Sequence, residues 1–128
     1  MNRLLLVAAG GAVGSVARYV VGVQTLRLFG SAWPYGTLTV NVAGGFLMGI
    51  LAAWLAQSAT ANPEPWRVLL GVGVMGGFTT FSAFTLETAL MIEKRAYAQA
   101  FTYTAASVLL ALAALFAGML FARRIFVA

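Results

Sequence analysis

The chain has 128 residues, of which 62% are hydrophobic and 9% are charged, and its formal net charge is +5. Because no soluble domain of this size needs so much apolar surface, we predict a single-domain, all-α integral membrane protein. Cysteine and histidine are both absent, which excludes disulfides, thiolate chemistry and histidine-based metal or acid–base sites. The basic residues flank the apolar runs without forming a patch, so the positive charge does not indicate nucleic-acid binding.

Acidic residues are equally scarce, since the chain contains only Glu64, Glu87 and Glu93. A paired-carboxylate site, as general acid–base catalysis requires, is not expected within one chain. We therefore predict that the protein is not an enzyme.

The first apolar run predicts a membrane helix over about residues 4–22. The short basic segment before it is also typical of a signal peptide, but three further apolar runs favour a membrane helix. Gly10 and Gly14 provide a small-xxx-small face for close helix approach. Arg18 lies near the end of this run, where it is either an interfacial anchor or a residue of a pore vestibule.

Residues 24–35 are predicted to connect the first two helices along the bilayer surface, ending in the interfacial sequence Trp-Pro-Tyr at 33–35. A second helix is predicted over about 36–57. Asn41 is its one strongly polar interior residue. An amide in a membrane helix faces protein or water, so Asn41 either joins helices or lines a pore.

The third apolar run, about 67–92, differs from a simple membrane helix because Gly76 and Gly77 lie in its middle. Several hydroxyl-bearing and phenylalanine residues then alternate: Phe78, Thr79, Thr80, Phe81, Ser82, Phe84 and Thr85. Adjacent glycines and β-branched residues favour the helix weakly, so we predict an interruption at 76–80. Interrupted membrane helices are typical ion sites, although a kink for close packing is an alternative.

A polar loop is predicted at 58–66 and a fourth helix at about 97–121, after the charged sequence at 93–95. Tyr103 and Ser107 are i, i+4 neighbours on one face of that helix. They add two hydroxyls to the polar residues of the second and third helices.

Four spans place the two termini on one side of the membrane. That side carries four arginines and the other carries three or four basic residues, depending on how Arg18 is counted. The positive-inside rule then gives almost no preferred orientation. We therefore predict dual topology and an antiparallel homodimer, because four short helices are too few to enclose a pathway alone.

Three segments together resemble the Fluc (CrcB) family of fluoride channels. They are GGFTTFSAF at 76–84 followed by Glu87, GTLTVNVAG at 36–44 and GAVGSVARY at 11–19. The likeness covers essentially the whole chain, including its length and loop pattern.

The resemblance implies a bacterial inner-membrane channel that exports fluoride and lowers its cytoplasmic concentration. It implies an antiparallel dimer with two pores and one central structural sodium ion, held by the backbone carbonyls of Gly76 and Thr79 from both subunits. It implies pores lined by Asn41, Phe81, Phe84, Tyr103 and Ser107. The family usually has threonine at the position of Ala83 and can have serine at that of Ala111, so hydroxyls are missing here.

The chemistry of these residues suits a small, strongly hydrated anion. Fluoride must exchange water for close hydrogen-bond donors, which the Asn41 amide and hydroxyls such as Thr80, Ser82 and Tyr103 provide. No lysine or arginine lies at mid-depth to trap the ion. Phe81 and Phe84 either present positive ring edges to an anion or simply pack. Glu87 and Arg18 are expected near the pore mouths.

The sequence also permits three other membrane functions. The main alternative is a small four-helix, dual-topology multidrug exporter, which needs a carboxylate in its first helix. The first helix here has no acidic residue. A sodium-coupled carrier differs from a channel in flux per dimer. A non-transporting assembly subunit leaves the polar residues of three helices unexplained.

Overall fold

The computed structural model describes residues 2–57 and 62–127, and all regular elements of those residues are helical. In chain order they are α1 (Arg3–Phe29), α2 (Tyr35–Gln57), α3 (Glu64–Trp66), the π-helical segment η1 (Arg67–Met75), α4 (Gly76–Phe78), α5 (Ser82–Glu93) and α6 (Tyr97–Val127). The predicted polar loop at 58–66 falls partly, at 58–61, outside the described residues.

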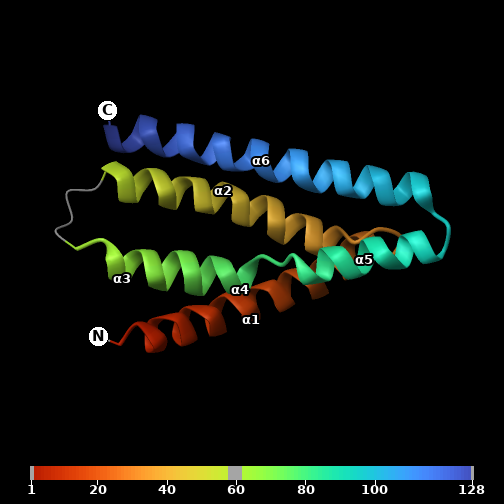
Figure 1. Cartoon of the computed structure of the whole chain (residues 1–128), viewed down its shortest axis with the longest axis horizontal. Coiled ribbons are helices and arrows are strands. Elements are labelled where there is room, and N and C mark those ends of the chain that lie inside the picture. Colours follow the sequence, from red (N-terminus) through yellow and green to blue (C-terminus); the bar gives the residue numbers. More distant parts are fainter. Residues whose placement is uncertain (1, 58–61, 128) are drawn as a thin grey trace.

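Within residues 2–57 and 62–127, four helical stretches are long and apolar enough to cross a membrane. They are Arg3–Phe29, Tyr35–Gln57, Glu64–Glu93 and Tyr97–Phe126, with 27, 23, 30 and 30 residues. A hydrocarbon core ~30 Å thick needs about 20 apolar residues, so each stretch is sufficient. Both chain ends lie at the same end of the bundle (Figure 1). The prediction of an all-α chain with four spans is confirmed.

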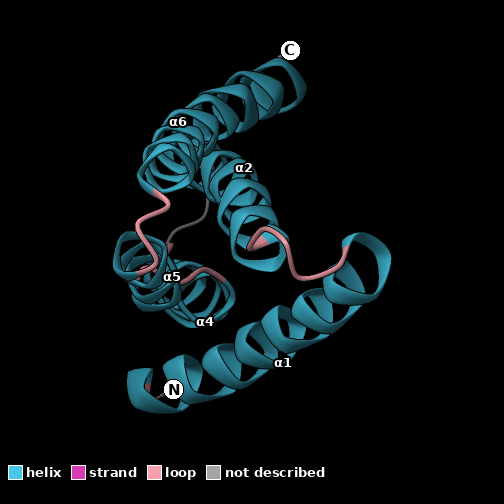
Figure 2. Ribbon diagram, turned by 90° about the vertical axis from the view of Figure 1, so that its right-hand side faces the viewer, coloured by secondary structure: helices cyan, strands magenta, loops and turns pink. Residues whose placement is uncertain are grey.

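The spans pack in two contacting pairs. α2 packs most extensively against α6, and α1 packs against η1 and α4. Figure 2 shows α2 beside α6, with α1 crossing on the other side of α4. Glycines permit these close approaches, because a Cβ on Gly10 would overlap the carbonyl oxygen of Leu69 and one on Gly49 would overlap that of Leu115.

The first helix is longer than predicted and takes in half of the expected connecting segment. No glycine or proline interrupts residues 23–29, and the Thr25 hydroxyl donates back to the Val21 carbonyl at 2.9 Å. The helix ends only at Gly30, whose φ of 80° suits glycine. Arg18 therefore lies well inside α1 and not at its end.

The third span leaves helical geometry later than predicted. Gly76 and Gly77 belong to α4, and Gly76 has φ −61° and ψ −38°. The backbone becomes extended at Thr79, with φ −87° and ψ 162°, and α5 begins at Ser82. The non-helical residues, 79–81, are thus the threonines and phenylalanine that follow the glycines. η1, which precedes them, is a long π-helical stretch, and such geometry is frequent at functional sites.

Candidate functional site

Asn41 of α2 holds the backbone of Thr80 between α4 and α5. The Asn41 Nδ2 atom donates to the Thr80 carbonyl at 2.9 Å, and the Thr80 N–H donates to Asn41 Oδ1 at 2.8 Å. Backbone groups outside regular structure must be satisfied at membrane depth, and Asn41 satisfies both groups of this residue. The structure thus shows the helix-joining role that the sequence left open for Asn41.

Two backbone carbonyls at the same place lose their helical partners. In a continuous helix Thr80 N–H would donate to the Gly76 carbonyl and Ala83 N–H to the Thr79 carbonyl. Thr80 N–H instead donates to Asn41, and Ala83 N–H donates to Thr80 Oγ1 at 3.1 Å. The carbonyls of Gly76 and Thr79, the two residues implicated in cation binding by the resemblance, are therefore released from the helical pattern.

A cavity of about 280 Å³ lies beside Asn41. Its walls come from α2, the 79–81 segment, α5 and α6: Asn41, Thr79, Thr80, Phe81, Phe84, Ser107, Val108 and Ala111. Four of the five residues predicted to line a pore are thus brought together. Ala111, where the family can have serine, leaves part of the wall apolar.

Ser107 is the polar residue of this wall that lacks a partner. It is buried, and its Oγ makes no hydrogen bond with any described residue. A buried hydroxyl without a partner is rare in proteins and often marks a place for a ligand or water. A residue that lines the smaller cavity therefore carries a buried hydroxyl without a hydrogen-bond partner among the described residues.

The two phenylalanines of the smaller cavity differ in exposure. Phe81 is 76% exposed and Phe84 is 9% exposed, and their ring centroids are 5.6 Å apart. Phe84 belongs to the buried cluster with Tyr103, whereas Phe81 contributes little to packing within one chain. A functional effect of Phe81 can therefore be separated from a folding effect.

Tyr103 is fully buried and does not line the smaller cavity. Its ring packs against Phe84 with centroids 5.3 Å apart. Its hydroxyl donates to Glu87 Oε1 at 3.0 Å, and the Thr37 hydroxyl donates to Glu87 Oε2 at 2.9 Å. Each carboxylate oxygen of Glu87 thus has one O–H donor. This three-residue group was not predicted from the sequence, although Thr37 lies one turn before Asn41 and Glu87 almost one turn after Phe84.

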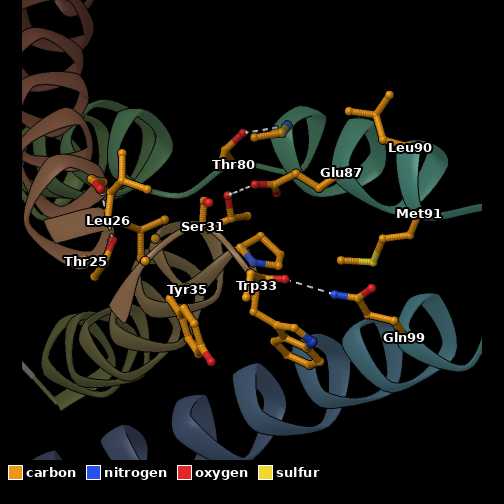
Figure 3. Close-up of a pocket in the computed structure, with 18 of the residues that line it drawn as sticks. Thr25, Leu26, Ser31, Trp33, Tyr35, Thr80, Glu87, Leu90, Met91 and Gln99 are labelled. Carbon is orange, nitrogen blue, oxygen red and sulfur yellow. Dashed lines mark hydrogen bonds between the residues drawn. The ribbon is translucent and has the colours of Figure 1, made fainter. Parts of the chain in front are cut away.

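A larger cavity of about 520 Å³ opens on the other side of Thr80, and Thr80 lines both cavities. Figure 3 shows Thr80 and Glu87 facing this space from the third span. Arg18 of α1 and Lys94, just beyond α5, also line it. Two cationic residues, Arg18 and Lys94, therefore line this cavity together with Glu87.

The remaining predicted residues lie near the 79–81 segment. Ser82 is exposed, and its Oγ is 3.3 Å from Thr80 Oγ1, so the two hydroxyls share a hydrogen bond. Ala83 lines the larger cavity, where the family usually has a hydroxyl. Among the described residues, no group of three or more histidine, cysteine, aspartate or glutamate side chains could hold a metal.

Four apolar spans whose polar residues gather inside the bundle define a multi-pass membrane protein. Residues 5–119 match the family model described as CrcB-like protein, Camphor Resistance (CrcB). The chain belongs to this family.

Curated relatives match nearly the whole chain. A protein of Caulobacter sp. (strain K31) is 79% identical over 126 residues, covering 98% of both chains. A protein of Phenylobacterium zucineum (strain HLK1) is 65% identical, covering 98% of this chain and 99% of the relative. One of Agrobacterium fabrum is 45% identical, covering 98% and 100%. All three carry the name fluoride-specific ion channel FluC, so the family is one of ion channels and not of enzymes.

Proposed function

We propose that the protein is a fluoride-selective channel of the bacterial inner membrane that lets fluoride leave the cell and so lowers its cytoplasmic concentration. The observation that carries the proposal is the buried, unpartnered Ser107 hydroxyl at the wall of the smaller cavity. The names of the relatives support the choice of anion.

The wall of the smaller cavity suits an ion that must give up water and still be released. The Asn41 amide has a second N–H besides the one bound to Thr80, and Ser107 has a free O–H. Among the described residues, none of those that line this cavity is basic, so no fixed charge would trap the anion. Phe81 and Phe84 would present positive ring edges to it.

The larger cavity serves in this proposal as the vestibule. Arg18 and Lys94 outnumber Glu87, the one acidic residue among the described residues that line it, so the net positive charge raises the local concentration of anions there. Thr80 borders both cavities and marks the point where fluoride passes from one to the other. Tyr103 and Ser82 line neither cavity and act through hydrogen bonds to residues that do. Tyr103 is bound to Glu87 and Ser82 to Thr80.

We further propose that the working unit is an antiparallel, dual-topology homodimer with a sodium ion at its centre, where the third span is interrupted. The released carbonyls of Gly76 and Thr79 are hard oxygen donors of the kind that sodium accepts. When bound, the ion would supply positive charge that joins the two copies and favours nearby anions. Gly76 is exposed in the single chain, which leaves its carbonyl available to a second copy.

The test of the proposed channel is anion efflux from liposomes that contain the purified protein. Fluoride should leave rapidly when a potassium ionophore compensates charge, and chloride should stay. Equal efflux of the two anions, or none of fluoride, would refute the proposal. The exporter alternative has no support in the structure, because α1 carries no carboxylate and Glu87 is bound by two hydroxyls.

A further inference from the structure

Four aromatic rings form a continuous row from the larger cavity to the smaller one. Trp33 lines the larger cavity and meets Tyr103 edge to face, with centroids 5.6 Å apart and an interplanar angle of 80°. Tyr103 then packs on Phe84 at 5.3 Å, and Phe84 on Phe81 at 5.6 Å. Such tilted and edge-to-face contacts favour a defined ring orientation. The row links a loop residue to the hydroxyl that binds Glu87.

Trp33 is held in place although it belongs to the short connection between α1 and α2. Gln99 of α6 donates from Nε2 to the carbonyl of Ala32 at 3.1 Å, and Figure 3 shows this bond next to the Trp33 ring. The Trp33 carbonyl accepts from Tyr35 N–H at 2.9 Å. Gln99 and Tyr103 are one turn apart on α6, so the loop is attached to the helix whose tyrosine its tryptophan contacts.

The orientation of Tyr103 determines whether its hydroxyl reaches Glu87. The ring is fully buried and contacts both Trp33 and Phe84. A rotation about its Cα–Cβ bond would move the hydroxyl away from Glu87 Oε1, which lies 3.0 Å from it. Loss of the Trp33 ring would open space on one side of Tyr103 and permit such a rotation.

We propose that Trp33 is a positioning residue, which acts through Tyr103 by directing its hydroxyl onto Glu87 at the wall of the larger cavity. The proposal rests on the proposed channel function, since its consequence is a change in fluoride flux. It assigns a role in conduction to a loop residue that does not line the smaller cavity.

The test is a double-mutant cycle on fluoride efflux from liposomes. We expect Trp33→Leu to lower the initial rate roughly three- to tenfold, the effect of losing one aromatic pair, and Trp33→Phe to retain most of it. In a Tyr103→Phe background, which lacks the hydroxyl, Trp33→Leu should have little further effect. The matched control is Trp54→Leu, whose ring pairs with Trp66 at 6.1 Å. Trp54 lies near the end of α2 and Trp33 just before its start, so this variant should leave flux unchanged.

A second variant covers the case in which Trp33→Leu fails to form dimers. Gln99→Leu detaches the loop without changing a ring, and it should lower flux in the parent but not in the Tyr103→Phe background. Additive effects in either cycle, full activity of both single variants, or an equal loss in Trp54→Leu would overturn the proposal.

A readout without transport separates this inference from the channel function. Tyr103→Phe should change the near-ultraviolet circular dichroism of the parent, and this difference is the contribution of Tyr103. The same difference, measured in each Trp33 variant, should be reduced in Trp33→Leu and retained in Trp33→Phe. A Tyr103 contribution of parental size in Trp33→Leu would overturn the positioning role even if fluoride conduction is demonstrated. If the Tyr103 contribution is reduced in Trp33→Leu but the parent passes no fluoride, the channel function is contradicted and the contact between the two rings is still supported.

Discussion

Asn41 and Thr80, thirty-nine positions apart in the chain, form two hydrogen bonds with each other, one in each direction. This pair joins α2 to the point where the third span leaves helical geometry. The two bonds satisfy the N–H and the carbonyl of Thr80, which have no helical partners. They also place the Asn41 amide at the wall of the smaller cavity.

Asn41→Asp tests this pair directly. A carboxylate would replace the Nδ2 donor with an oxygen, so that two acceptors would face each other at the Thr80 carbonyl. The N–H donor proposed for fluoride would also be lost. We expect fluoride efflux to be nearly abolished and the folded state to lose about 1–3 kcal/mol, the cost of an unsatisfied buried polar group. Efflux and thermal unfolding in detergent give the two quantities. Thr39→Val, at an exposed position of the same helix, is the control, and parental flux in Asn41→Asp would contradict the pore assignment.

Phe81→Ile separates an anion contact from packing. Because Phe81 is 76% exposed in the single chain, Phe81→Ile should leave the folding of that chain nearly unchanged, while loss of the positive ring edge should lower flux roughly tenfold. Phe101→Ile is a matched control, since Phe101 is also 76% exposed but does not line the smaller cavity. If the two variants conduct alike, Phe81 has no part in the path.

Gly76→Val tests the proposed cation site and the antiparallel dimer together. A Cβ on Gly76 would have its nearest neighbour, the Gly71 carbonyl oxygen, at 3.8 Å, which is an ordinary contact. A Cβ therefore fits within one chain, and we attribute a loss of dimers in a folded chain to the second copy or its shared ion. We expect loss of dimers and of sodium-dependent stability, measured by cross-linking and by unfolding with and without sodium. Gly22→Val, which would meet nothing within 4 Å, should behave as the parent, and sodium-binding dimers of Gly76→Val would place the ion elsewhere.

Glu87→Gln is expected to have a mild effect. Glu87 accepts one hydrogen bond on each oxygen. In the glutamine variant one hydroxyl can turn and accept from the amide, because hydroxyl groups both donate and accept. Flux should fall by roughly two- to fivefold, the net worth of one neutral hydrogen bond. A complete loss of efflux in a folded dimer would show that the negative charge itself is required.

Dual topology can be measured with a single introduced cysteine, because the chain has none of its own. Asn62→Cys places the thiol at an exposed position before α3. A membrane-impermeant reagent should label about half of the protein in intact cells and the rest after permeabilisation, as the balanced basic residues predict. Labelling of all molecules from one side would rule out the antiparallel arrangement.

The sequence by itself determined the class of protein, the number of spans and the family. Apolar runs of about 20 residues decide the spans because the thickness of hydrocarbon is fixed. The polar residues Asn41 and Ser107 could be selected because polar side chains are unusual within a membrane span. Phe81 and Phe84 were selected through the resemblance of residues 76–84 to the family. Helix ends were less predictable: α1 continues to Phe29 since no residue there stops it.

Only the tertiary structure decided which polar groups meet. Spacing along one helix does not show that Asn41 satisfies Thr80, or that Thr37 and Tyr103 converge on Glu87, because these contacts depend on how α2 and α6 pack against the third span. The same packing places the departure from helical geometry after Gly77. Glycine permits a break but does not require one, whereas a hydrogen bond from Thr80 N–H to another helix removes the one that would have continued α4.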